Sequence, residues 1–153
     1  DVESAEEMYR AVLSEYDRSD IAIMCAAVAD YAPETVSDVK LKRTGEDRIL
    51  RLRPNPDIAA GLGRRKRPGQ CLVGFALETN DEEMNARLKM EKKNLDFIVL
   101  NSLRDAGAGF QCDTNKVTVI GKQGDPVEIP CKPKIEVAAD IVDIIGRYVS
   151  EDR

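Results

Sequence analysis

Residues 71–101, CLVGFALETNDEEMNARLKMEKKNLDFIVLN, predict a strand, a helix and a second strand in succession. Residues 71–78 and 96–101 are short, nearly continuous apolar runs, as is typical of parallel strands that are covered on both faces. Residues 81–94 between them are rich in charge and predict a helix. This strand–helix–strand unit indicates an α/β fold.

The first part of the chain shows the same alternation. Residues 4–18 predict an amphipathic helix that begins with a capping box of Ser4 and Glu7. Residues 20–28 are nearly continuous apolar and predict another buried strand.

The segment between these two units predicts a hairpin and a helix. Residues 40–43 and 48–53 read as two short strands joined by a turn. Residues 55–66 predict a helix with Asn55 as its N-cap and Pro56 in its first position.

The last part of the chain adds strands and one more helix. Residues 109–130 predict a β-meander with turns at 113–115 and 122–125. Residues 132–149 predict a helix whose inward side chains are Ile135, Ala138, Ala139, Val142 and Ile145. The whole pattern predicts a single domain over residues 1–153, a three-layer Rossmann-like α/β fold with a mostly parallel sheet and an appended hairpin or meander.

The composition is that of a globular protein, with 42% hydrophobic and 33% charged residues in a chain of 153. No apolar run approaches the roughly 18 residues that a membrane span needs. The first ten residues, DVESAEEMYR, have none of the features of a signal peptide. We therefore expect a cytoplasmic protein with no membrane partner.

Cysteine and histidine usage narrows the chemistry. The four cysteines, at positions 25, 71, 112 and 131, are scattered without CxxC spacing. Cys25 and Cys71 fall in apolar strand patterns, which favours buried thiols in a reducing compartment over a disulfide framework. The chain has no histidine, which argues against a structural zinc site and removes the usual general base. If the protein is an enzyme, we expect its chemistry to depend on charge stabilisation and positioning.

Positive charge is concentrated in residues 40–67, which contain ten Lys and Arg against three acids in a chain whose net charge is −5. Such a block can attract nucleic acid. The block lacks interleaved aromatic residues, however, and the whole chain is acidic. We therefore expect no nucleic-acid partner, and a nucleic-acid binder is kept as a weaker hypothesis.

Polar side chains stand at the carboxyl ends of the predicted parallel strands, at Asp30, at residues 78–80 (Glu, Thr, Asn) and at residues 101–102 (Asn, Ser). Ligands of open α/β sheets bind beyond these ends. The helix start at residues 55–58 adds free N–H groups that suit an anion. We therefore expect these groups to converge on one crevice. The chain contains no GxGxxG or Walker A motif, so a phosphate would be bound by other means.

Lys89 and Lys93 are spaced i, i+4 and so lie on one face of the predicted helix. By spacing alone, a solvent-exposed basic face is the better explanation for them. Lys40 alone reads as a surface lysine, Phe75 as a core residue and Glu78 as a solvated acid. The combination of cations, an acid, an aromatic and a helix start nevertheless predicts a nucleotide site in which lysines surround the phosphates and Mg²⁺ completes the neutralisation.

Six motifs carry a resemblance to a known family: AAVADY (26–31), KLKR (40–43), NPDI (55–58), VGFALETN (73–80), K-x-x-x-K-N (89–94) and DFIVLN (96–101). In this order and at these spacings, the chain resembles the bacterial phosphopantothenate–cysteine ligases, also called phosphopantothenoylcysteine synthetases. These usually form the C-terminal half of bifunctional coenzyme A biosynthesis flavoproteins. The resemblance covers essentially the whole chain.

This resemblance implies a reaction in two steps. The carboxylate of 4′-phosphopantothenate attacks the α-phosphate of CTP, which gives an acyl-cytidylate and pyrophosphate. The amine of L-cysteine then attacks the acyl group and releases CMP. The resemblance also implies Mg²⁺ bound with CTP, a homodimer, and FMN only if a decarboxylase domain is fused upstream.

The family's functional residues map onto ten positions of this chain. Lys40 corresponds to the catalytic lysine at the phosphates. The resemblance assigns nucleotide binding to Ala26, Asp30, Lys40, Asn55, Pro56, Asp57, Ile58, Phe75, Lys89 and Lys93. It assigns no metal ligands.

The chain departs from the family at its front. The family's domain begins with a strand, a glycine-containing turn and a Ser-Ser-Gly segment with an asparagine, which handle phosphopantothenate. We therefore expect residues 1–153 to be about the C-terminal two-thirds of the ligase domain. A non-catalytic nucleotide-binding α/β module remains the alternative function.

Overall fold

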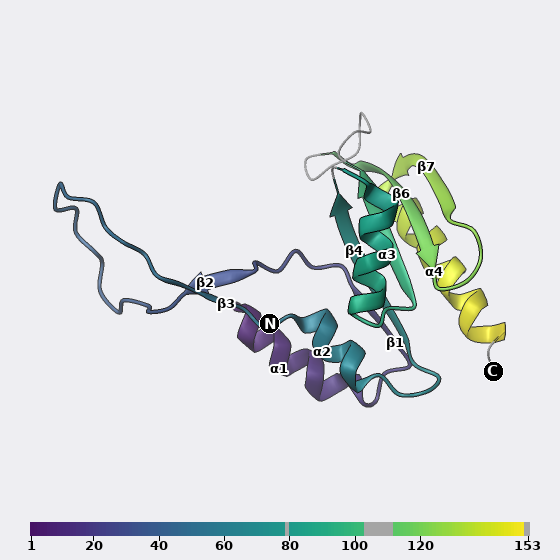
Figure 1. The fold of residues 1–153 in the computed structure, drawn as a ribbon, viewed down its shortest axis with the longest axis horizontal. Coiled ribbons are helices and arrows are strands. Elements are labelled where there is room, and N and C mark those ends of the chain that lie inside the picture. The colour runs from purple at the N-terminus through teal and green to yellow at the C-terminus, as the bar shows by residue number, and fades with distance from the viewer. Residues whose placement is uncertain (79, 103–111, 152–153) are drawn as a thin grey trace.

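Five strands form one sheet in the computed structural model, which describes residues 1–78, 80–102 and 112–151. They are β1 (Ile21–Met24), β4 (Cys71–Glu78), β5 (Phe97–Ser102), β6 (Thr114–Gly121) and β7 (Val127–Pro133). The strand order is β1-β4-β5-β6-β7, and Figure 1 labels β1, β4, β6 and β7 of this sheet. The β1–β4 and β4–β5 pairs are parallel, whereas the β5–β6 and β6–β7 pairs are antiparallel.

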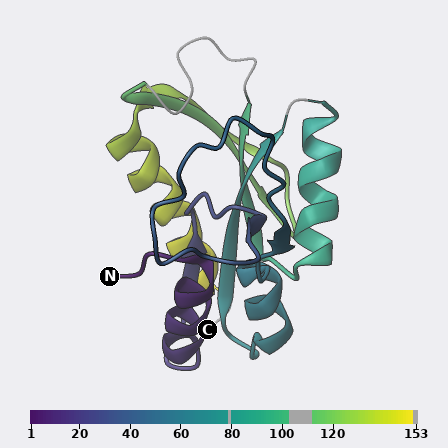
Figure 2. The same ribbon diagram turned by 90° about the vertical axis from the view of Figure 1, so that its left-hand side faces the viewer.

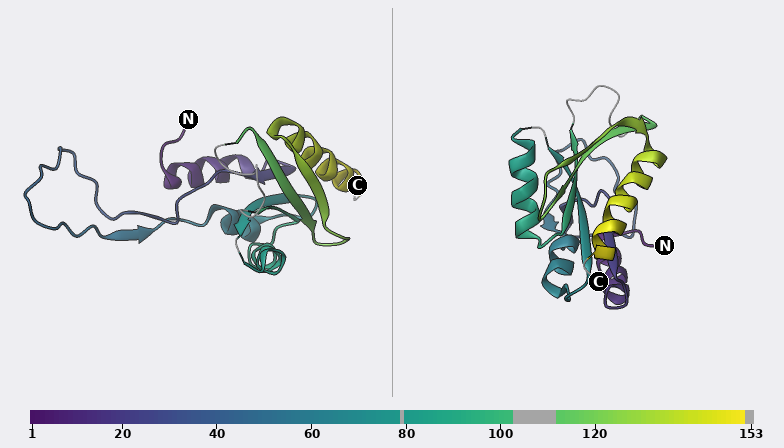
Figure 3. Two further views of the ribbon diagram at one scale, coloured as in Figure 1. Left: turned by 90° about the horizontal axis from the view of Figure 1, so that it is seen from above. Right: turned by 90° about the vertical axis from the view of Figure 1, so that its right-hand side faces the viewer.

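Helices lie on both faces of this sheet. They are α1 (Ala5–Tyr16), α2 (Ile58–Arg65), α3 (Glu82–Lys92) and α4 (Lys134–Glu151). The first three helices pack on one face and α4 packs on the other, so that the sheet is the middle of three layers (Figures 2 and 3).

Strand β4 shows why the sheet has a core on each side. Successive side chains of a strand point to opposite faces. Leu72 and Ala76 therefore belong to the core under α1, α2 and α3, while Cys71 and Val73 belong to the core under α4. All four side chains are buried. The predicted α/β fold with three layers is confirmed. The sheet is parallel only over β1, β4 and β5.

The predicted hairpin is wrong in its residues. Residues 40–43 form no strand, and the described pair is β2 (Tyr31–Pro33) with β3 (Leu52–Pro54), which run antiparallel. We call residues 34–51 the arm, because they extend from this pair away from the sheet (Figures 1 and 3). Its apolar side chains are largely exposed: Val36, Val39, Leu41, Ile49 and Leu50. A two-stranded ribbon without a face to pack against is marginal, so the pairing is confined to the base of the arm.

Helix α4 buries Ile145, as predicted, but the other side chains predicted to face inward are exposed. Val137, Ile141 and Ile145 face the sheet and are at most 5% exposed, whereas Ile135 and Val142 are 79% and 56% exposed. The helix carries apolar residues on two neighbouring stripes, so periodicity alone does not choose between them.

The local expectations elsewhere are partly confirmed. Ser4 and Glu7 form the predicted capping box of α1. The turn at 122–125 joins β6 to β7, with Gly124 at φ +82°. The turn predicted at 113–115 is wrong, because β6 already begins at Thr114, and residues 109–111 lie outside the described residues.

The cysteines and helices allow two further statements. All four cysteines are free thiols, and Cys71 is buried as expected, but Cys25 is exposed because it follows the end of β1. Among the described residues, no helix combines the length and the apolar character that crossing a membrane requires.

Candidate functional site

A cavity of about 330 Å³ opens at the carboxyl end of β1 and beside the middle of β4. Its walls come from the loop after β1, the start of α2, β4 and one side of α3. Of the predicted site residues, it brings together Ala26, Asp30, Asn55, Pro56, Asp57, Ile58, Phe75, Lys89 and Lys93. These positions span 68 residues of sequence, from Ala26 to Lys93, and they meet because the loop after β1, the start of α2 and one side of α3 border the same cavity beside β4.

Asn55 ties two walls of the cavity together. Its side-chain Nδ2 donates a hydrogen bond to the Ala29 carbonyl at 2.8 Å, and its main-chain N–H donates to the Asp30 carbonyl at 2.8 Å. The prediction that Asn55 is the N-cap is therefore wrong, because its amide already serves the loop after β1. Pro56 likewise precedes the helix, which begins at Ile58.

Asp57 is the N-cap of α2. Its Oδ1 accepts a hydrogen bond from the Ala60 N–H at 3.0 Å. The first N–H groups of a helix have no acceptor within it, and the helix dipole makes this end positive. The start of α2 therefore offers the cavity a place for an anionic group such as a phosphate.

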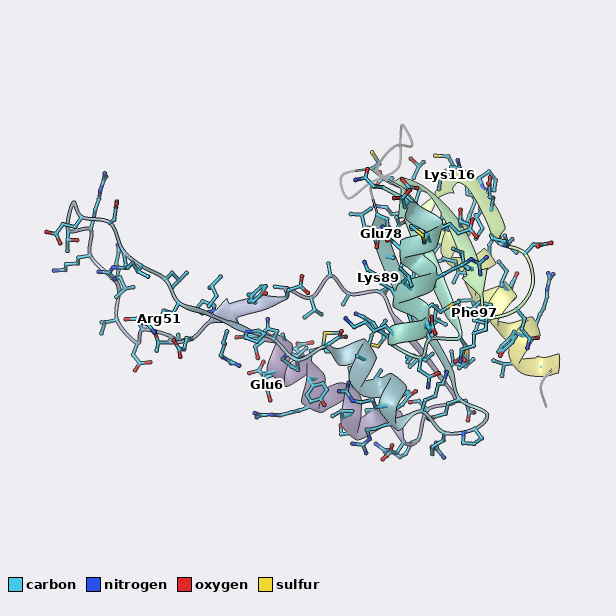
Figure 4. All side chains as sticks on the ribbon, in the orientation of Figure 1. Glu6, Arg51, Glu78, Lys89, Phe97 and Lys116 are labelled. Carbon is cyan, nitrogen blue, oxygen red and sulfur yellow. The ribbon has the colours of Figure 1, made fainter. Side chains whose placement is uncertain are left out.

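Two lysines of the K-x-x-x-K pattern reach the same cavity, and each meets a carboxylate. Lys93 Nζ lies 3.0 Å from Asp57 Oδ2. Lys89 Nζ lies 2.5 Å from Glu78 Oε1, which makes an ion pair. Figure 4 shows Lys89 on α3 and Glu78 at the end of β4. The lysine side chains are 46% (Lys89) and 29% (Lys93) exposed, so solvent reaches both pairs.

The charges of the cavity lining are balanced. Burial alone raises the pKa of Asp57, but the hydrogen bond from the Ala60 N–H and the ammonium of Lys93 lower this pKa overall. Asp57 is therefore a carboxylate at neutral pH, and with Asp30 it offsets the charges of Lys89 and Lys93. A polyanion that binds here must bring or meet further positive charge.

Glu78 and Phe75 differ from the simplest expectation. The Glu78 side chain is only 14% exposed and pairs with Lys89, so it is not a solvated acid. The sequence signal for a largely buried Glu78 was its position directly after an apolar run that predicts a buried strand. Phe75 both lines the cavity and packs against the core under α4, so its two interpretations are compatible.

Asn80 and Asn101, the other strand-end residues whose side chains the structure describes, do not line the cavity. Asn101 Oδ1 accepts a hydrogen bond from Asn115 Nδ2 at 2.8 Å, which ties it to β6. Thr79 and the side chain of Ser102 lie outside the described part of the structure. Lys40 lies on the arm and does not line the cavity, so its place at the phosphates stays a prediction.

The basic block of residues 40–67 is divided between two places. Residues 40–53 belong to the arm and to β3, whereas residues 64–67 end α2 and follow it, and these parts lie apart in Figure 1. The second group is engaged within the domain: Arg65 pairs with Asp17, and Lys66 pairs with Asp96. The block therefore forms no continuous basic face.

The described residues contain no group of three or more Asp, Glu, Cys or His side chains that could hold a metal ion. Mg²⁺ commonly needs only one or two carboxylates when substrate phosphates supply the other ligands. Asp30 in the cavity wall fits that role, since both oxygens of Asp57 already have partners.

Comparison with known proteins adds to this geometry. Residues 1–148 match the family described as the DNA/pantothenate metabolism flavoprotein C-terminal domain. The chain is 53% identical over 142 residues to a protein named cysteine/cysteine sulfinic acid decarboxylase from an unknown prokaryotic organism, with 93% of this chain and 40% of that protein covered. It is 48% identical over 145 residues to the coenzyme A biosynthesis bifunctional protein CoaBC of Bacillus subtilis (strain 168), with 95% of this chain and 36% of that protein covered.

A solved structure is also similar. The crystal structure of the C-terminal domain of a coenzyme A biosynthesis bifunctional protein CoaBC superposes with a TM-score of 0.79 at 36% sequence identity, and the match covers 98% of this chain and 65% of that one. The chain thus spans 40% or less of the length of the two curated relatives.

Proposed function

Because this chain belongs to the family of the DNA/pantothenate metabolism flavoprotein C-terminal domain, we propose that it forms the nucleotide-binding part of a CTP-dependent phosphopantothenate–cysteine ligase. The ligase joins 4′-phosphopantothenate to L-cysteine through an acyl-cytidylate and releases pyrophosphate and CMP, a step of coenzyme A biosynthesis in the cytoplasm. The observation that carries this proposal is the meeting of Lys89, Lys93 and the start of α2 at one cavity. The names of the CoaBC relative and of the CoaBC C-terminal domain structure support it.

The 53% identical relative has a decarboxylase name, and that name describes a protein of which this chain matches 40%. The residues of this cavity favour binding of phosphates over decarboxylation. Its cations and helix start are groups that stabilise phosphoryl oxygens, and the chain has no histidine to act as a general acid.

The chain's own groups supply positioning and charge stabilisation. The start of α2 would bind phosphate oxygens, and Lys89 and Lys93 would exchange their carboxylate partners for the phosphates of CTP. Held in this way, the α-phosphate is in place for attack by the substrate carboxylate, and the departing pyrophosphate keeps its ammonium partners. Mg²⁺, held by Asp30 together with the phosphates, would add the positive charge that the balanced lining lacks.

The arm supports a homodimer. Val36 and Ile49 are 87% and 91% exposed, and apolar side chains gathered on one projecting segment are typical of an interaction surface. In this proposal the arm pairs with a second copy and carries Lys40 to the partner's cavity, because Lys40 does not line the cavity of its own chain.

The nucleotide site is tested by titration calorimetry of the full-length protein with CTP and Mg²⁺. We expect Lys89→Ala and Lys93→Ala each to weaken binding by about tenfold or more, since a hydrogen bond to a charged group contributes about 1.5–3 kcal/mol. Lys92→Ala is the matched control, because this neighbouring lysine of α3 does not line the cavity. ATP should compete poorly. Equal affinities of all variants would refute the site.

Catalysis and the role of Lys40 need a separate test. Pyrophosphate release with CTP and 4′-phosphopantothenate should occur in the wild type; CTP binding without any release would instead favour the non-catalytic module. Mixing Lys40→Ala and Lys89→Ala proteins should restore part of the activity if Lys40 acts in the partner's site, since a mixed dimer then has one intact site. No recovery after verified subunit exchange would place Lys40 in its own chain's site.

A further inference from the structure

Gly63 brings α2 into direct contact with the main chain of Lys93. A Cβ atom at position 63 would lie 1.9 Å from the Lys93 carbonyl oxygen and 2.8 Å from its carbonyl carbon. Any side chain at this position must push α2 away from the end of α3. Gly63 is also buried, so its surroundings leave little room for such a shift.

Asn94, the residue after Lys93, is held in place by hydrogen bonds to Gly63, Lys66 and Lys122. Its φ of +51° is a left-handed conformation in which Asn is among the tolerated residues. Its Nδ2 donates to the Gly63 carbonyl at 2.9 Å, and its own carbonyl accepts from Lys66 Nζ at 2.7 Å. Lys122, in the turn after β6, donates to Asn94 Oδ1 at 3.2 Å.

The two ends of Lys93 are therefore held by one helix. Its main chain rests against Gly63, while its ammonium reaches Asp57 at the start of the same helix. Gly63 lies six residues after Asp57, the N-cap of α2, which corresponds to about 9 Å along the helix axis. The place of the ammonium relative to the phosphate-binding end of α2 thus depends on how closely α2 and α3 approach.

We propose that Gly63 and Asn94 are positioning residues of the candidate site, which fix the main chain of Lys93 against α2 so that its ammonium stays at the start of that helix. Neither residue lines the cavity, so neither touches the ligand. The proposal deepens the proposed function and rests on it only for the ligand that Lys93 would bind.

The first test measures the Asp57 carboxyl by carbon-detected NMR titration, without any nucleotide. Burial raises the pKa of Asp57 in the folded protein, whereas the hydrogen bond from the Ala60 N–H, the ammonium of Lys93 and the charge of Lys92 lower it. We expect Gly63→Ala and Asn94→Gly to raise this pKa toward the value found in Lys93→Met. Gly keeps the left-handed backbone at position 94 while it removes the side-chain contacts.

Gly146→Ala is the matched control for Gly63→Ala, because a Cβ atom on this glycine of α4 meets nothing within 4 Å. It should leave the Asp57 pKa unchanged. If Gly63→Ala fails to fold, Asn94→Gly carries the test. An unchanged Asp57 pKa in the folded variants would overturn the proposal.

The second test is a double-mutant cycle on the affinity for CTP with Mg²⁺ in the full-length protein. If Asn94 acts through Lys93, then Lys93→Met should weaken binding about tenfold, Asn94→Gly should weaken it several-fold, and the double variant should be no weaker than Lys93→Met alone. Additive losses would mean that Asn94 supports the fold in general and would overturn the proposal. A wild type that does not bind CTP would refute the proposed function, and the Asp57 titration would still decide the role of Gly63 and Asn94.

Discussion

Lysine–carboxylate pairs stand at both ends of the parallel strands, and they differ in burial and in the number of their partners. At the amino ends, Asp96 is only 8% exposed. It accepts hydrogen bonds from Lys66 at 2.7 Å, from Lys122 at 3.0 Å and from the Leu72 N–H at 2.8 Å. We call Asp96, Lys66 and Lys122 the buried ion cluster.

At the carboxyl ends, the Lys89–Glu78 and Lys93–Asp57 pairs border the cavity, and their lysines remain open to solvent. A pair in which solvent reaches both members, as in Lys93–Asp57, contributes little to stability, about 0–1 kcal/mol, and its lysine can change partners at low cost. A buried pair is different, because removing one member leaves the other as an uncompensated charge. The comparison teaches that the same residue types stabilise the fold at one end of the sheet and remain exchangeable at the other.

The largest effect is expected from Asp96→Asn. This change leaves the ammonium groups of Lys66 and Lys122 without a carboxylate, and the Lys66 side chain is only 10% exposed. We expect the free energy of unfolding to fall by about 3–5 kcal/mol. Urea unfolding followed by circular dichroism measures this loss.

Asp17→Asn is the control for Asp96→Asn. It removes an exposed pair with Arg65, whose side chains are 48% (Arg65) and 57% (Asp17) exposed, and it should cost less than about 1 kcal/mol. Equal losses in the two variants would contradict the distinction between buried and exposed pairs.

The second-largest effect is expected from acid, which should reduce the stability that the buried ion cluster contributes. Burial raises the pKa of Asp96, but the hydrogen bonds from Lys66 and the Leu72 N–H outweigh it and lower the pKa overall. A carboxyl whose pKa is lower in the folded state stabilises the fold above its unfolded pKa of about 3.9, and this stabilisation is lost as the pH falls through the folded value. The wild type should therefore lose more stability than Asp96→Asn between pH 6 and pH 2 (approximate limits). Parallel pH profiles of the two proteins would reject this explanation of acid lability.

The smallest effect on stability is expected from Lys93→Met. The side chains of the Lys93–Asp57 pair are 29% (Lys93) and 48% (Asp57) exposed, so its loss should change the free energy of unfolding by less than about 1 kcal/mol. The affinity for CTP with Mg²⁺ should fall about tenfold in the same variant. A loss of stability as large as that of Asp96→Asn would show that this end of the sheet is structural as well.

Much of the candidate site follows from sequence patterns. The spacing of Lys89 and Lys93 puts both on one side of a helix, and the strand-end rule places Asp30 and the start of α2 near them. The structure brings these groups to one cavity. The sequence patterns did not predict the carboxylate partners of the lysines. Glu78 lies 11 residues from Lys89, and Asp57 lies 36 residues from Lys93.

Other expectations failed where two local solutions were equally good. Both Asn55 and Asp57 are suitable N-caps, and the hydrogen bond of Asn55 to the Ala29 carbonyl decides between them. The position of Lys40 depends on the path of the arm, and exposed apolar residues there indicate no contact within the same chain that would set this path.

The sequence by itself determined the features that are encoded within a few neighbouring residues: the capping box of α1, the buried strands β4 and β5, and the shared helix face of Lys89 and Lys93. Only the tertiary structure decided which stripe of α4 is buried and which carboxylates find several hydrogen-bond donors inside the protein. It also decided that Gly63 contacts the main chain of Lys93. The reason is physical. Periodicity and capping are short-range preferences, whereas burial and ion pairing depend on segments that become neighbours only when the sheet and its helices pack.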